Sequence, residues 1–217
     1  MAPAPGQAGS CAWPERVAQR GLRAGADNPL PVTRPAPCPA PDGQPPLSPR
    51  QFRDALGMFA TGVTIVTTRG ADGVPVGLTA SSFNSVSLAP PLVLWSLAHK
   101  TSSHDVFFAS GHYAIHVLAV EQRALAERFA TRGVDRFAGL PWSEGAGGAP
   151  LLPGAAAVFE CVNRSQYTEG DHTIFVGQVE RCSHRAGASP LLYHGGMFYT
   201  EHPLGSLSAR AARPLHK

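Results

Sequence analysis

The chain carries a long succession of short strand-like segments, and this pattern restricts its fold more than any other feature. Val63–Thr68 is a β-branched run, and Leu92–Leu97 is a continuous apolar run bracketed by prolines, which is typical of a strand buried on both faces. Turn residues at Ala71–Gly73 and Glu169–Asp171 separate such segments. Many strands with few helices favour a mainly β fold, a closed barrel, over a parallel α/β sheet.

The remaining elements follow from periodicity and from turn chemistry. Ser48-Pro49 suits a helix start, and apolar residues then recur at helical spacing from Phe52 to Phe59. Further predicted strands span residues 74–78, 85–88, 113–117, 155–167 and 172–182, with a last hairpin formed by 191–193 and 197–199. Further predicted helices span residues 101–110 and 121–131, and a long loop rich in Gly and Pro spans 133–154.

Composition divides the chain into three parts. Residues 1–47 hold eleven of the 21 prolines and few large apolar residues, so they cannot bury enough surface to offset the entropy lost on ordering. We therefore expect a disordered extension at 1–47, one folded domain at 48–203 and a flexible tail at 204–217.

Charge and motif content exclude several classes of protein. The net charge of +3 comes from scattered residues, which argues against a nucleic-acid-binding face. No apolar run of about 18 residues is present, so we expect a cytoplasmic protein without membrane spans. Rossmann, P-loop and nucleophile-elbow signatures are absent. The four cysteines form no CxxC pair, which favours free thiols, and no metal site is predicted.

Two segments combine small hydroxyl residues with positions suited to a ligand. Residues 77–85, Gly-Leu-Thr-Ala-Ser-Ser-Phe-Asn-Ser, could cradle a phosphate and bond the edge of a planar ring, although similar stretches form ordinary turns. His99–Ser103 follows the buried strand at a predicted helix start, where free amides and Lys100 favour an anion. Simple helix capping by serine or threonine explains the same residues.

Histidines supply the third candidate. His172 begins a predicted strand directly after a turn, where its imidazole could position a nicotinamide or supply a proton. A solvated histidine capped by Asp171 is the alternative. His112 and His116 share one face of a predicted strand, a spacing that a metal could use but that two ordinary histidines also satisfy.

Taken in order, these segments resemble the flavin reductase family that serves two-component monooxygenases. The matching pieces are FRDALGMFATGVTIVTT at 52–68, GLTASSFNSVSLAPPLVLWSLA at 77–98, HYAIHVLAVEQRALAERFA at 112–130, RFAGL at 136–140, GDHTIFVGQVE at 170–180 and PLLYHGGMFY at 190–199. The resemblance implies an FMN-binding split β-barrel with a few short helices, generally a homodimer with flavin near the subunit interface.

The resemblance also implies roles for individual residues. Implied flavin or phosphate contacts are Gly77, Leu78, Thr79, Ala80, Ser81, Ser82, Ser96, Lys100, Thr101, Ser103, Ala130, Thr131 and Tyr199. His172 matches the histidine of the family's Gly-Asp-His turn, which implies a catalytic position on the nicotinamide side.

The function implied is hydride transfer from NADH or NADPH to FMN or FAD, followed by delivery of the reduced flavin to a flavin-dependent monooxygenase. Three alternatives stay open from the residues alone. They are a flavin-binding electron carrier without turnover, a split-barrel oxidase similar to those acting on pyridoxamine phosphate, and a β-barrel interaction protein with a vestigial pocket.

Overall fold

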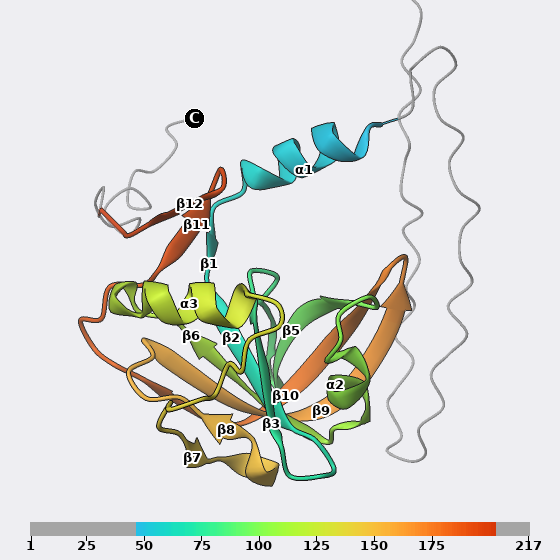
Figure 1. Ribbon diagram of the computed structural model, residues 1–217, viewed down its shortest axis with the longest axis vertical. Coiled ribbons are helices and arrows are strands. Elements are labelled where there is room, and N and C mark those ends of the chain that lie inside the picture. The colour runs from blue at the N-terminus through green and yellow to red at the C-terminus, as the bar shows by residue number, and fades with distance from the viewer. Residues whose placement is uncertain (1–46, 203–217) are drawn as a thin grey trace, which may run out of the picture. The chain divides into compact units, whose positions relative to one another are not determined.

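A computed structural model describes residues 47–202, and strands predominate in it (Figure 1). The helices are α1 (Pro49–Gly57), α2 (His104–Ala109) and α3 (Arg123–Ala130), with the 3-10 turns η1 (Val120–Gln122) and η2 (Ala146–Gly148). The strands are β1 (Thr61–Gly62), β2 (Thr64–Arg69), β3 (Pro75–Ala80), β4 (Asn84–Leu88), β5 (Pro91–Ala98), β6 (His112–Val117), β7 (Ser143–Glu144), β8 (Pro150–Leu151), β9 (Ala157–Glu169), β10 (His172–His184), β11 (Leu192–His194) and β12 (Met197–Tyr199).

The mainly β prediction is confirmed. The predicted extension, apart from Leu47, and the predicted tail lie outside the described residues. None of the helices within 47–202 has the length and apolar character needed to cross a bilayer.

The main sheet has seven antiparallel strands in the order β3-β2-β6-β9-β10-β5-β4. Its longest hairpin joins β9 to β10 through Gly170, whose φ of 59° lies in the left-handed region that glycine adopts without strain. The two edge strands, β3 and β4, are not hydrogen-bonded to each other. The strand count favoured a closed barrel, and this detail is wrong because the sheet remains open.

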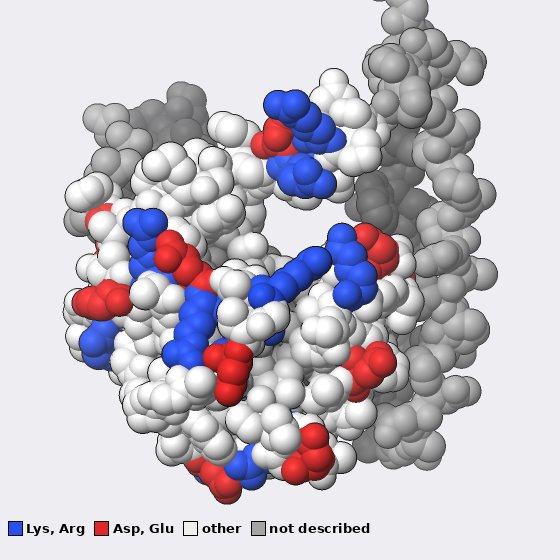
Figure 2. All heavy atoms as spheres, in the orientation of Figure 1, with Lys and Arg blue, Asp and Glu red and all other residues white. Residues whose placement is uncertain are grey.

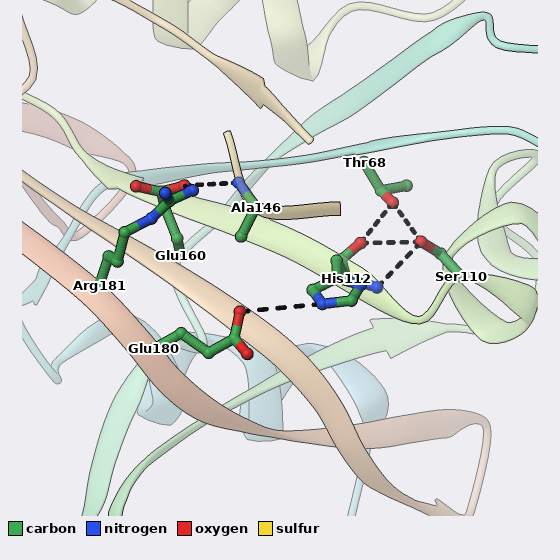
Figure 3. Close-up of polar contacts among 7 residues, drawn as sticks. All are labelled: Thr68, Ser110, His112, Ala146, Glu160, Glu180 and Arg181. Atoms are coloured by element: carbon green, nitrogen blue, oxygen red, sulfur yellow. Dashed lines mark hydrogen bonds and ion pairs between the residues drawn. The ribbon is translucent and has the colours of Figure 1, made fainter. Parts of the chain in front are cut away.

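Two smaller sheets complete the fold. The strands β1, β11 and β12 form one, and β7 pairs with β8 in the other. The predicted loop at 133–154 thus contains β7, η2 and β8, because residues distant in sequence hold it in place. The Glu160 carboxylate accepts the Ala146 N–H and an Arg181 N–H, each at 2.6 Å (Figure 3).

The core of the main sheet is built around Trp95, which is fully buried on β5. Its ring stacks on Phe175 at 4.7 Å between centroids and meets Phe107 and Tyr113 edge-on at 5.1 and 5.7 Å. Gly177 of β10 lies directly against the Tyr113 hydroxyl, where a Cβ atom would collide with it. The glycine at this position is therefore required by the aromatic core.

The two described cysteines are free, as predicted. Cys161 on β9 and Cys182 on β10 lie on adjacent strands, the first buried and the second exposed. Burial, assisted by the nearby Glu180 and Glu160 carboxylates, raises the pKa of Cys161 to about 12. Its thiol is consequently protonated and unreactive at neutral pH.

His116 is a buried cross-link between strands and loop. Its Nε2 accepts the Leu152 N–H at 3.0 Å, so the ring proton lies on Nδ1 and is donated to the Ile65 carbonyl at 3.0 Å. Both ring nitrogens are occupied, and His116 serves packing rather than metal binding. Burial lowers its pKa from 6.5 to about 4, although the bond to Ile65 opposes the shift.

This buried imidazole predicts an acid-dependent loss of stability. Between pH 6.5 and about 4 the unfolded chain binds a proton at His116 that the folded chain does not, so the free energy of unfolding falls as pH falls. Between these two pH values, we expect the free energy of unfolding to fall by about 2 to 3 kcal/mol more in the wild type than in His116→Gln. Denaturant titrations at several pH values measure it. The matched control is Ile115→Val, a buried and non-titrating position of the same strand, which should keep the wild-type slope; equal slopes in wild type and His116→Gln would contradict the prediction.

Candidate active site

A cavity of about 920 Å³ opens at the split of the sheet. Its lining comes from residues 75–82 of β3 and the segment after it, 96–97 and 100–103 around the end of β5, 106, 129–130 and 132–137 at the end of α3, and 172 at the start of β10. Segments far apart in sequence therefore meet here, at a gap between the edge strand β3 and the end of β5.

Ser82 bridges this gap with its side chain. Strand β4 pairs with β5 only as far as Leu94, so the backbone of Ser96 has no strand partner on that side. The Ser82 hydroxyl replaces the missing strand: it accepts the Ser96 N–H at 2.9 Å and donates to the Ser96 carbonyl at 3.1 Å. These two hydrogen bonds fix Ser82 against the end of β5, so Ser82 helps define this wall of the cavity.

Helix α3 closes the other side through two contacts with β3. A Cβ at Gly77 would approach the Phe129 ring to 2.7 Å, so glycine allows the helix to lie this close. The Thr79 hydroxyl donates to the Ala126 carbonyl of α3 at 2.7 Å. The side-chain positions of Gly77 and Thr79 therefore hold the helix, while both residues also line the cavity.

The structure brings together most of the residues singled out from the sequence. Those in the cavity lining are Gly77, Leu78, Thr79, Ala80, Ser81, Ser82, Ser96, Lys100, Thr101, Ser103, Ala130 and His172. Thr131 and Tyr199 are not among the lining residues. The Thr131 hydroxyl donates to the Glu127 carbonyl at the end of α3, and Tyr199 belongs to β12 of the small sheet.

Ser103 carries a polar atom that the described protein does not satisfy. It precedes α2 as the cap residue, yet its hydroxyl makes no capping hydrogen bond. The residue is only 7% exposed, and its Oγ has no hydrogen-bond partner among the described residues. Capping alone therefore does not account for this serine, and a bound group in the cavity would satisfy it.

Positive charge predominates among the lining residues. Lys100, Arg132 and Arg136 contribute cations, against the single carboxylate of Asp135. Figure 2 shows basic and acidic side chains mixed over the rest of the face that carries α1 and α3. The excess of positive charge is thus a property of the cavity lining, where an anionic ligand would benefit from it.

Arg136 was not singled out from the sequence, although it lies within the matching RFAGL piece. Its guanidinium donates to the Gly77 carbonyl at 2.7 Å and to the Thr131 carbonyl at 3.0 Å. It thus links the end of α3 to the edge of β3, and partial burial lowers its pKa. Its role rests on a contact between residues 59 positions apart in the sequence. No local motif predicts such a contact.

His172 lies at the mouth of the cavity, with its side chain 46% exposed. Its Nδ1 is 2.6 Å from Oδ1 of Asp171. This hydrogen bond to His172 is the main cause that lowers the pKa of the Asp171 carboxyl. The carboxylate holds the proton on Nδ1, which leaves Nε2 of the neutral ring as an acceptor.

Comparison with known proteins agrees with this geometry. Residues 56–202 match the family described as "Flavin reductase like domain". The chain belongs to the flavin reductase family.

Three relatives show the extent of the likeness. The FMN reductase (NADH) SmoA of Agrobacterium fabrum is 50% identical over 69% of this chain and 84% of that protein. The reductase component of the flavin-dependent trigonelline monooxygenase of Acinetobacter baylyi is 44% identical over 70% of this chain but only 48% of that longer protein. Among solved structures, the NADH:FAD oxidoreductase SgcE6 of Streptomyces globisporus superposes with a TM-score of 0.68 at 40% identity, covering 72% of this chain and 94% of that one.

The flavin reductase prediction is therefore confirmed at the level of family and enzyme class, together with its use of flavin and a nicotinamide. The cavity of this flavin reductase also suits a flavin on physical grounds. The unpartnered Ser103 hydroxyl and the Lys100 and Arg132 cations match a phosphate, and small residues at 79–82 allow a ring to approach the backbone.

Proposed function

We propose that this flavin reductase transfers a hydride from NADH to FMN or FAD in the 920 Å³ cavity and releases the reduced flavin to a flavin-dependent monooxygenase. The observation that carries the proposal is the arrangement of Ser103 with its unpartnered hydroxyl and His172 in one cavity of a flavin reductase fold. NADH appears in the names of both SmoA and SgcE6, and the trigonelline enzyme's reductase is a monooxygenase component, which supports the donor and the partner.

The phosphate side of the site is formed by Lys100, Thr101 and Ser103, with Ser96 nearby. Charge-assisted hydrogen bonds from these groups would anchor the flavin phosphate. The ring side is formed by β3 and residues 81–82. Because β3 is an edge strand, its outer backbone groups are not used in the sheet. Amides there would stabilise negative charge on the pyrimidine edge of the reduced ring.

When bound, the flavin supplies a two-electron acceptor for the nicotinamide hydride. His172 would hold the nicotinamide: with its Nδ1 bonded to Asp171, its Nε2 could accept a hydrogen bond from the carboxamide. A hydride carries its electron pair with it, so no protein acid or base is required at this step. The protein's task is to bind and orient the two molecules.

Anaerobic mixing tests the proposed function directly. Purified protein with FMN or FAD should bleach the flavin absorbance on addition of NADH, with many turnovers per protein and lower activity with NADPH. If flavin fluorescence changes without NADH oxidation, the protein is a flavin carrier and the proposal fails. Oxidation of an amine substrate by a tightly held FMN would indicate an oxidase, and unchanged fluorescence would indicate an interaction protein.

Replacing His172 separates the two binding steps. We expect His172→Ala to raise the KM for NADH by about tenfold, the size of one lost hydrogen bond to a ligand, and to leave the flavin dissociation constant within about twofold. Steady-state kinetics and fluorescence titration measure these values. The matched control is His184→Ala, an exposed histidine at the far end of the same strand, which should change neither. If His172→Ala oxidises NADH as the wild type does, His172 does not bind the nicotinamide.

We further propose that the protein is a homodimer formed through α1 and the small sheet. Helix α1 begins as predicted, with a capping box in which Ser48 Oγ accepts the Gln51 N–H at 3.1 Å. Its apolar residues Phe52 and Leu56, however, are exposed within the protomer, and Phe59 just after the helix is 73% exposed. Exposed large apolar residues continue onto the small sheet at Tyr193, Met197 and Tyr199. An apolar patch of this kind is typical of a protein interface.

The dimer has a measurable consequence. We expect a mass of two chains by light scattering for the wild type, and a shift toward one chain for the pair Phe52→Ser and Phe59→Ser, because each removes an aromatic anchor from the interface. The control pair Arg50→Ser and Arg53→Ser alters exposed charged positions of the same helix and should leave the mass unchanged. A monomeric wild type would refute the dimer without affecting the reductase proposal.

A further inference from the structure

A buried hydroxyl lies between two imidazoles directly behind the cavity. The Thr173 Oγ1 is 2.9 Å from Nε2 of His104 and 3.2 Å from Nε2 of His99. Thr173 is only 1% exposed, and the two imidazole rings meet edge-on at 5.2 Å between centroids. One hydroxyl therefore contacts two ring nitrogens, and it can donate its proton to only one of them.

Asp105 decides the direction of these hydrogen bonds. Its carboxylate lies 3.0 Å from Nδ1 of His104 and can only accept, so the neutral His104 ring carries its proton on Nδ1. Nε2 of His104 then accepts the Thr173 hydroxyl proton, and the Thr173 oxygen accepts the proton on Nε2 of His99. The result is one ordered series, from His99 through Thr173 and His104 to Asp105, in which every donor has an acceptor.

The series joins the two segments that carry opposite sides of the site. His99 and His104 bracket the phosphate-side residues 100–103, whereas Thr173 follows the nicotinamide-side His172 directly in β10. The backbone N–H of His99 also donates to the backbone carbonyl of Asp171 at 3.0 Å. Rings of Phe108 and Phe175 pack against His104 at 5.7 and 6.5 Å, which restricts its movement.

We propose that Thr173 is a positioning residue that sets the distance between the phosphate-side loop and His172, so that bound flavin and nicotinamide lie in register. The inference rests on the proposed function and deepens it. None of His99, His104 and Thr173 lines the cavity, so Thr173 acts through the residues on either side of it.

Thr173→Val tests the proposal, because valine keeps the branched shape and removes the hydroxyl. We expect the KM for NADH to rise by roughly tenfold and the flavin dissociation constant by roughly threefold, in contrast to His172→Ala, which changes only the first. Thr173→Ser should restore both values to within about twofold of wild type. Should valine prove too disruptive, His99→Leu removes the first donor and should shift both values in the same direction.

A double variant distinguishes positioning from a general loss of structure. If Thr173 acts on NADH through His172, adding Thr173→Val to His172→Ala should change the KM for NADH by less than about twofold. The matched control is Thr68→Val. It removes another buried hydroxyl, whose partners are Ser110 Oγ at 2.6 Å and the His112 carbonyl at 2.7 Å, and none of these three residues lines the cavity (Figure 3). It should lower the melting temperature without changing either binding constant.

The outcomes separate the inference from the function on which it rests. If the wild-type protein does not oxidise NADH in the presence of flavin, the proposed function is overturned. The flavin dissociation constant of Thr173→Val then still tests whether Thr173 positions the phosphate-side loop. An active wild type with Thr173→Val binding constants within about twofold of its own overturns the positioning role. The positioning role is also overturned if Thr173→Val raises the KM for NADH as much in the His172→Ala variant as in the wild type.

Discussion

The unpaired edge of β3 is the constraint on which the rest of the site depends. A strand with free backbone groups on one side leaves them open to other partners, and three segments pack around β3 here. Helix α3 packs against Gly77, the Arg136 guanidinium binds the Gly77 carbonyl, and Ser82 completes the gap toward β5. The cavity is the space that these coverings leave. A closed barrel would have no such edge, so the open sheet and the binding site are two aspects of one feature.

Local sequence pattern predicted the strands well, because alternation and turn chemistry act between near neighbours. The two strands predicted at 155–167 and 172–182, with Glu169-Gly170-Asp171 as the turn between them, form the β9–β10 hairpin. The Gly and Pro content of residues 133–154 predicts a loop, whereas the structure has two short strands there, β7 and β8. What orders it is distant in sequence: Glu160 binds the Ala146 N–H, and the Thr67 hydroxyl donates to the Pro150 carbonyl. Periodicity within a window carries no information about such contacts.

The same holds for the site: local motifs predict its separate segments, but not the contacts between residues distant in sequence. Small hydroxyl residues at strand ends and the Gly-Asp-His turn mark ligand-binding segments one at a time, each with an ordinary structural explanation. Their ordered resemblance to flavin reductases united them, and the structure brings them around one cavity. The sequence does not predict roles for Arg132 and Arg136, because a single arginine in a loop belongs to no local motif. Tyr199 was expected over the flavin, but within one protomer its strand belongs to the separate β1-β11-β12 sheet, exposed beside α1.

The histidines show how placement, rather than residue type, determines chemistry. Burial keeps His116 neutral in the core, where two backbone groups occupy its ring nitrogens. Asp171 fixes the tautomer of the half-exposed His172, and Asp105 orders the Thr173 series through His104. Hydride transfer needs no protonated side chain, so the value of these imidazoles lies in directional hydrogen bonds. An imidazole that donates at one nitrogen and accepts at the other links two groups at a defined separation. That property is what a site requires when its main task is to hold two planar rings in register.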